Sequence, residues 1–144
     1  MKKILKQLFF LSLLVTVLAS CEKDENKVYY EGGTSPALTA SVSGPLVFTI
    51  ADRNNPAITF NWTNPDYKFT TGLSSQDVFY TLQFDTTGSN FTNPAIGEVS
   101  ISNDLSKSFT VGELNTKILA MGLLEDMPHN MEMRIKASLV NNSA

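Results

Sequence analysis

The 144-residue sequence is poor in the side chains from which reactive centres are built, because it contains one cysteine and one histidine. The single cysteine, Cys21, excludes an intramolecular disulfide, so stability has to come from apolar burial and backbone pairing. The histidine, His129, has no cysteine or acidic residue at the spacing of a metal ligand. The sequence therefore predicts no disulfide framework and no metal site.

Catalytic motifs are also missing. No serine lies at a strand–turn–helix elbow, there is no glycine-rich phosphate loop, and the acidic residues are scattered over turns and outward faces. We therefore expect no enzyme activity, no catalytic residue and no cofactor. The sequence alone identifies no ligand-binding residue.

The N-terminal segment has the pattern of an export signal. Lys2, Lys3 and Lys6 precede an apolar run over residues 8–18, which is too short to cross a bilayer comfortably. Residues 18–21 read Leu-Ala-Ser-Cys and match the lipobox of bacterial lipoproteins. We expect residues 1–20 to be a signal peptide removed before Cys21. The alternative is that Cys21 only ends an ordinary leader that is cleaved elsewhere.

Lipidation is the chemistry that this box predicts for Cys21. The thiolate is the strongest nucleophile available to take a diacylglycerol group. Each buried CH₂ of an acyl chain contributes about 0.8 kcal/mol, so two or three chains hold a protein firmly on a membrane. We therefore expect a lipid-anchored protein of the outer membrane, exposed at the cell surface, with outer-membrane lipid as its first partner.

Residues 21–35 are expected to form a lipidated acidic tether. Residues 22–27 are charged or polar throughout, as in a solvated linker, and also resemble the acidic export signal of surface lipoproteins in the Bacteroidetes. Without the leader, eight basic residues remain against fourteen acidic ones, a net charge of −6. Such a domain repels phosphate backbones, so no nucleic-acid partner is expected.

Residues 36–144 are expected to form one all-β domain. Alternation of polar and apolar side chains between turns predicts strands rather than helices. The segments with this pattern are residues 37–50 as one bent strand, 57–63, 78–85, 96–101, 105–111 and 131–140.

One short helix interrupts the strands. Thr110 and Glu113 fit a capping box, in which each side chain accepts from a backbone N–H of the other residue. Leu114, Ile118 and Met121 form the apolar stripe, and the glycine after them fits a stop. We expect this helix to cover one end of the sandwich.

Residues 57–65 and 133–137 resemble strands of immunoglobulin-like and fibronectin type III-like domains. The resemblance implies a β-sandwich, of which the last of the usual seven strands is missing here. We therefore expect a truncated N-terminal domain of a longer protein, with an unpaired edge beside the sixth strand.

The order of the segments also resembles the N-terminal region of SusE-type outer-membrane lipoproteins. The segments concerned are the lipobox, the acidic tether, residues 33–39, the tryptophan strand, residues 80–85 and residues 108–115. The resemblance implies a spacer domain in a starch or other glycan uptake system, beside a TonB-dependent importer and other glycan-uptake lipoproteins. It also implies polysaccharide binding through C-terminal domains that this chain does not contain. The alternative is a structural or adhesive surface lipoprotein that contacts a protein partner.

Aromatic residues are the remaining candidates for a binding surface. Trp62 could stack on a sugar, but it shares a strand face with other apolar residues, so we expect it in the core. Tyr67 and Phe69 are expected to anchor a loop rather than bind a ligand. Tyr29 and Tyr30 are expected to pack at the base of the domain.

Overall fold

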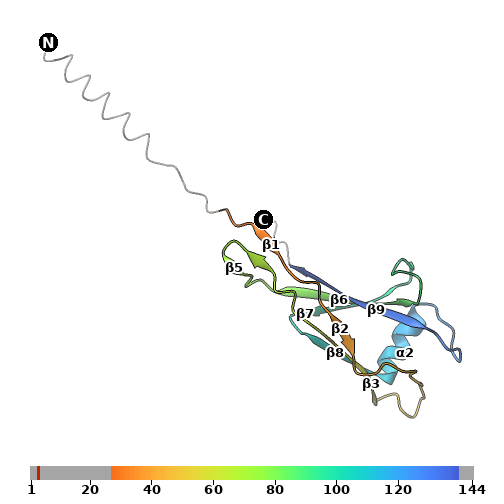
Figure 1. The fold of residues 1–144 in the computed structure, drawn as a ribbon. Helices are drawn as coiled ribbons and strands as arrows, with labels where there is room; N and C mark the ends of the chain where they lie inside the picture. Colours follow the sequence, from red (N-terminus) through yellow and green to blue (C-terminus); the bar gives the residue numbers. More distant parts are fainter. Residues whose placement is uncertain (1–2, 4–26, 140–144) are drawn as a thin grey trace.

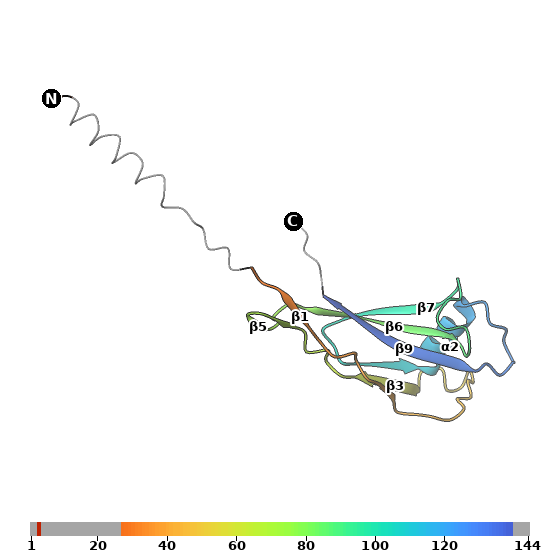
Figure 2. The ribbon, with the colours of Figure 1, turned by 45° about the horizontal axis from the view of Figure 1, so that its top comes forward.

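The computed structural model describes residue 3 and residues 27–139, and within residues 27–139 it shows two three-stranded sheets packed face to face, with a small third sheet at one end (Figures 1 and 2). The prediction of an all-β sandwich with one short helix is confirmed. Its finer assignment to immunoglobulin-like or fibronectin type III-like domains stays a prediction.

The first large sheet has the order β2-β3-β8, formed by Leu38–Ala40, Pro56–Trp62 and Ser106–Thr110. All its pairs are antiparallel. In β3 the alternation of the sequence becomes alternation in space, since Ile58, Phe60 and Trp62 are buried while Asn61 is exposed. This sheet therefore turns one apolar face toward the second sheet.

The second large sheet has the order β7-β6-β9, formed by Gly97–Ser102, Val78–Thr86 and Met131–Leu139. The central strand β6 pairs antiparallel with both neighbours, and its pairing with β9 runs from Val78↔Leu139 to Thr86↔Met131. Tyr80, Leu82 and Phe84 point from β6 into the core.

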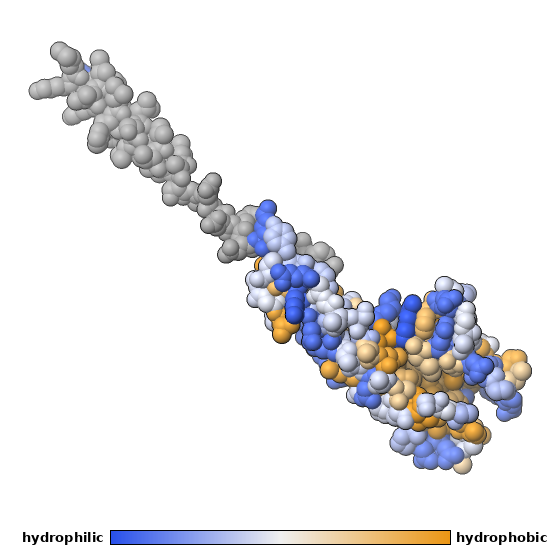
Figure 3. Space-filling view, in the orientation of Figure 1, coloured by the Kyte–Doolittle hydropathy of each residue, from blue (hydrophilic) through white to orange (hydrophobic). Residues whose placement is uncertain are grey.

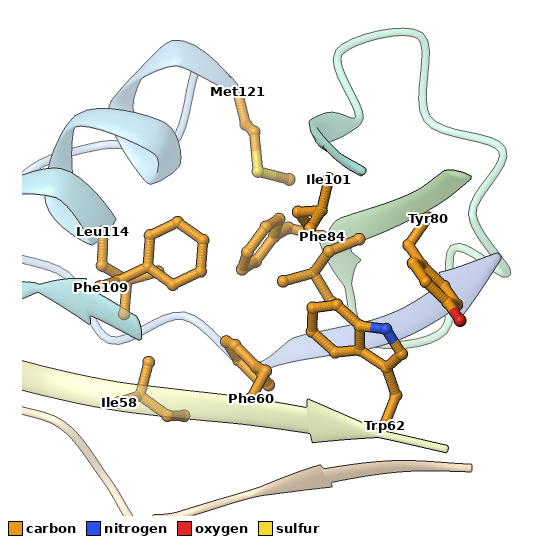
Figure 4. Close-up of a cluster of buried hydrophobic side chains, with 10 residues drawn as sticks. Ile58, Phe60, Trp62, Tyr80, Phe84, Ile101, Phe109, Leu114 and Met121 are labelled. Atoms are coloured by element: carbon orange, nitrogen blue, oxygen red, sulfur yellow. The ribbon is translucent and has the colours of Figure 1, made fainter. Parts of the chain in front are cut away.

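The core between the sheets is rich in aromatic rings. Phe60, Phe84 and Phe109 meet edge to face, with ring centroids 5.7–6.1 Å apart. Trp62 lies 5.6 Å from Tyr80, and Figure 4 shows these rings between the layers. Full burial of one such side chain contributes about 1.5–3 kcal/mol.

The helix α2, Val111–Ala120, closes one end of this core. Its capping box is confirmed, since the Thr110 N–H donates to Glu113 Oε2 at 2.8 Å and the Glu113 N–H donates back to Thr110 Oγ1 at 3.3 Å. Leu114 and Met121 reach into the core, as Figure 4 shows. The predicted position over the end of the sandwich is therefore confirmed.

Two features of the fold differ from the expectation. The bent strand predicted over residues 37–50 is wrong beyond Ala40, because residues 41–55 form a loop whose Leu46 and Phe48 fill the edge of the core without strand pairing. Pro45 removes one backbone donor from this loop, and Pro56, which also lacks an N–H, follows the loop as the first residue of β3.

The second difference is a small sheet that the sequence did not predict. The strands are β1, Tyr30–Gly32, β4, Lys68–Phe69, and β5, Gly72–Leu73, in the order β1-β4-β5. Strand β1 lies inside the segment expected to be the tether. The ordered structure therefore begins before residue 36, and residues 64–77 hold a hairpin rather than a plain loop.

Candidate functional site

The small sheet lies at the end of the domain where the chain arrives from its N-terminus (Figure 1). The Thr70 N–H donates to the Tyr29 carbonyl at 3.0 Å, and the Tyr29 N–H donates to the Thr70 side-chain hydroxyl at 3.2 Å, so contact between the two segments extends one residue beyond β1 and β4. A third contact, from the Thr34 N–H to the Pro65 carbonyl at 2.7 Å, holds the chain after β1. Segments separated by some forty residues are thus fixed side by side.

Aromatic rings join this small sheet to the large ones. The Tyr30 ring centroid lies 5.9 Å from that of Tyr67 and 5.6 Å from that of Phe69. The Tyr67 hydroxyl donates to the Ala137 carbonyl of β9 at 3.0 Å. Burial of the Tyr67 phenol raises its pKa, and the neighbouring Tyr30 raises it further by a smaller amount. The phenol therefore stays protonated and can donate this hydrogen bond.

These contacts settle the predicted roles of the aromatic residues at this end. Tyr67 and Phe69 anchor a loop, as expected, and Tyr30 packs against them. The prediction for Tyr29 is wrong, because 61% of this residue is exposed to solvent. Tyr29 precedes β1 and follows Val28, which is also exposed.

A shallow hollow lies beside the small sheet. Its lining contains the carboxylates of Glu31 and Asp66, the ammonium of Lys68 and the apolar side chain of Leu73. No aromatic ring lines it, so it offers no stacking platform for a sugar.

The outer edge of β9 is open in the part of the chain that the structure describes. The Thr87 N–H donates to the Asn130 carbonyl at 2.9 Å, which fixes the hydrogen-bonding phase of the β6–β9 ladder. By alternation, Met133, Ile135 and Ala137 direct their backbone groups away from β6. One of these outward groups, the Ala137 carbonyl, already accepts a hydrogen bond from the Tyr67 hydroxyl.

Apolar side chains are half-buried along this open side. Met131, Met133 and Ile135 of β9 pack on the core without being enclosed, as do Leu46 and Phe48 of the loop 41–55. Figure 3 shows the resulting apolar surface between β9 and β2, in the half of the molecule away from β1.

The face of the second sheet that is turned away from the core carries a polar cluster, in which Gln83 and Asp85 are themselves buried. Gln83 donates to Glu98 and accepts from Arg134 Nε at 2.6 Å, and the Arg134 guanidinium lies 4.2 Å from the Phe91 ring centroid. The buried carboxylate of Asp85 accepts from the Thr86 N–H at 2.7 Å. The bonds of Asp85 hold the start of the loop after β6. Within residues 27–139, no group of three or more histidine, cysteine or acidic side chains could hold a metal ion.

The other predicted residues have simple surroundings. Trp62 is buried in the core, as predicted, and its Nε1 has no acceptor among the described residues. His129 Nε2 lies 2.8 Å from the Leu124 carbonyl. Cys21 and its lipobox lie outside the described residues. Among the described helices, none has the length and hydropathy that a membrane crossing requires.

Comparison with protein families gives a match to the SusE outer membrane protein family over residues 23–136, which is most of the chain. The chain belongs to the SusE outer membrane protein family. Comparisons with curated proteins and with solved structures gave no match. The resemblance found in the sequence is thereby confirmed, and the chain is an outer-membrane protein of a Sus-type system.

Proposed function

We propose that this SusE-family chain is a lipoprotein anchored in the outer membrane through Cys21 and that its sandwich is a spacer for a glycan-binding and uptake system. The observation that carries the proposal is the family match, which starts at residue 23, two residues after the lipobox cysteine. The leader, the lipobox and the family match are independent features that agree.

The spacer role is supported by how the side chains are used. Trp62, Phe60, Phe84 and Phe109 place their rings in the core, and the Tyr67 hydroxyl donates to a backbone carbonyl, so these rings are not available to stack on a sugar. On this proposal, polysaccharide is bound by further domains, and a TonB-dependent importer with other glycan-uptake lipoproteins surrounds the anchor. The domain itself performs no chemistry.

A second candidate is a structural or adhesive surface lipoprotein that contacts a protein partner. The open edge of β9 favours it, because outward backbone groups beside half-buried apolar side chains suit pairing with a further strand. A test of glycan binding by the full-length protein distinguishes the two candidates, because only the glycan-uptake system requires it.

Metabolic labelling with palmitate tests the anchor. The parent protein should incorporate label and a Cys21→Ala variant should not, while a Ser20→Ala variant, which keeps a small residue beside the cleavage site, should label like the parent. Equal labelling of the parent and the Cys21→Ala variant would refute the anchor.

Affinity electrophoresis of the full-length gene product tests the glycan system. Retardation in starch, pullulan or another polysaccharide is expected for the intact protein, and residues 21–144 alone should migrate unretarded. If no polysaccharide retards the full-length product, the adhesive candidate replaces the glycan one.

A further inference from the structure

The small sheet exposes apolar side chains that no part of the core uses. Val28, Tyr29, Tyr30 and Leu73 are 56%, 61%, 57% and 67% exposed, and all lie on or beside β1 and β5. In Figure 3 this end is mostly white and blue, with a smaller orange area, because tyrosine ranks near the middle of the hydropathy scale. Its rings nevertheless carry a large apolar surface.

Chain length places this end beside the proposed anchor. Val28 follows Cys21 by seven residues. At about 3.5 Å per residue, even a fully extended chain of that length reaches only about 25 Å. With Cys21 lipidated, contact between the small sheet and the bilayer surface becomes an intramolecular event, so a weak affinity is enough to populate it.

The chemistry of the exposed groups suits the headgroup region of a membrane. Tyrosine has an apolar ring and a polar hydroxyl, and it is enriched at membrane–water interfaces for that reason. Beside the small sheet, Lys27 and Lys68 balance Glu31 and Asp66 in formal charge, whereas residues 22–25 of the tether add a net charge of −2 between the sheet and Cys21.

We propose that the small sheet, with Val28 and Tyr29, docks against the headgroup region of the membrane that holds the acyl chains of Cys21. This proposal rests on the lipid anchor of the proposed function. The rings of Tyr30, Tyr67 and Phe69 and the bond from Tyr67 to Ala137 connect the docked end to the sandwich. Docking therefore sets the orientation of the whole domain, with α2 and the loop 41–55 pointing away from the membrane (Figure 1).

Fluorescence quenching on vesicles tests the docking. The lipidated mature protein carrying Tyr29→Trp is reconstituted into phosphatidylethanolamine–phosphatidylglycerol vesicles with brominated acyl chains. The matched control carries Ile50→Trp in the loop 41–55, at a position that is 89% exposed. The natural Trp62 is buried in both proteins and gives the same background.

We expect tryptophan at position 29 to shift its emission to the blue and to be quenched several-fold more strongly than tryptophan at position 50. A Leu73→Glu change in the Tyr29→Trp protein should reduce that quenching, whereas Val47→Glu in the distal loop should leave it unchanged. Both glutamates replace exposed side chains, so neither should change the thermal midpoint of unfolding.

Vesicle flotation separates the two ways in which the proposal fails. If the protein floats with the vesicles but positions 29 and 50 are quenched equally, the docking is refuted and the anchor stands. If the protein does not float and carries no palmitate, the anchor is refuted and the docking with it. Unchanged quenching in the Leu73→Glu protein would also refute docking through the small sheet.

Discussion

The sandwich body and the small sheet are built on different principles. In the body, most strands run for five to nine residues and place alternate apolar side chains in a shared aromatic core. In the small sheet, the strands have two or three residues and most of their side chains are exposed. Stability resides in the body, whereas the small sheet depends on the body for its order.

Contacts between the two regions are few and specific. The rings of Tyr30 and Tyr67, the hydroxyl of Tyr67 and the close approach of Gly33 to Pro65 make the junction. Two exposed tyrosines, Tyr29 and Tyr30, lie at this end beside the junction. The difference between the regions therefore agrees with an end that contacts another surface and a body that supports it.

The largest expected effect tests the body. Phe60→Ala should lower the free energy of unfolding by about 3–5 kcal/mol, because it removes a ring that meets both Phe84 and Phe109. Chemical denaturation measures the change. Asn61→Ala, on the exposed face of the same strand, should change it by less than about 0.5 kcal/mol. Equal losses in the two variants would contradict an aromatic core as the source of stability.

A smaller effect is expected at the junction. A Cβ atom at Gly33 would lie 2.5 Å from Tyr67 Cδ1 and 2.8 Å from the Pro65 carbonyl oxygen, so Gly33→Ala forces the two segments apart. We expect a loss of about 1–3 kcal/mol. Hydrogen exchange should show faster local opening at the amides of β1 and β4.

Gly44→Ala is the matched control for this change, because a Cβ atom there meets nothing within 4 Å. It should leave both the stability and the exchange rates of the small sheet unchanged. If Gly33→Ala behaves in the same way, the small sheet is not held through this contact.

Removing the hydroxyl of Tyr67 should cause a still smaller loss in the free energy of unfolding. Tyr67→Phe keeps the ring stack but leaves the Ala137 carbonyl without its donor, and should cost about 0.5–1.5 kcal/mol. Tyr29→Phe, whose ring is exposed, serves as the control and should be neutral. Differential scanning calorimetry of the two variants measures the difference. Equal midpoints would mean that the bond does not couple the small sheet to β9.

The same contrast explains what the sequence could predict. Strands β3, β6 and β9 were predicted within one or two residues, because half-buried strands of seven to nine residues repeat their pattern several times. Strands of two residues, such as β4 and β5, contain no repeat from which to predict them. Their order comes from tilted and edge-to-face contacts of the Tyr30 ring with residues about forty positions later. The clustering of aromatics at positions 29–30 and 67–69 was the one available signal in the sequence.

The smallest expected effect is a pH dependence that belongs to the body alone. Glu113 accepts from the backbone and side chain of Thr110, and these hydrogen bonds lower its pKa below the ordinary value of 4.5. The capping contribution of the carboxylate is therefore fully present above pH 4.5 and is lost as the pH falls through the lowered pKa.

Glu113→Gln keeps an acceptor for the Thr110 N–H but removes the charge. The variant should consequently lose less stability than the parent as the pH falls below 4.5 through the lowered pKa, as thermal unfolding at a series of pH values would measure. Tyr67→Phe changes the small sheet and not the helix cap, so it should retain the acid sensitivity of the parent. Parallel pH profiles for the parent and Glu113→Gln would show that the capping carboxylate does not stabilise the body, and a flattened profile for Tyr67→Phe would show that the two regions titrate together.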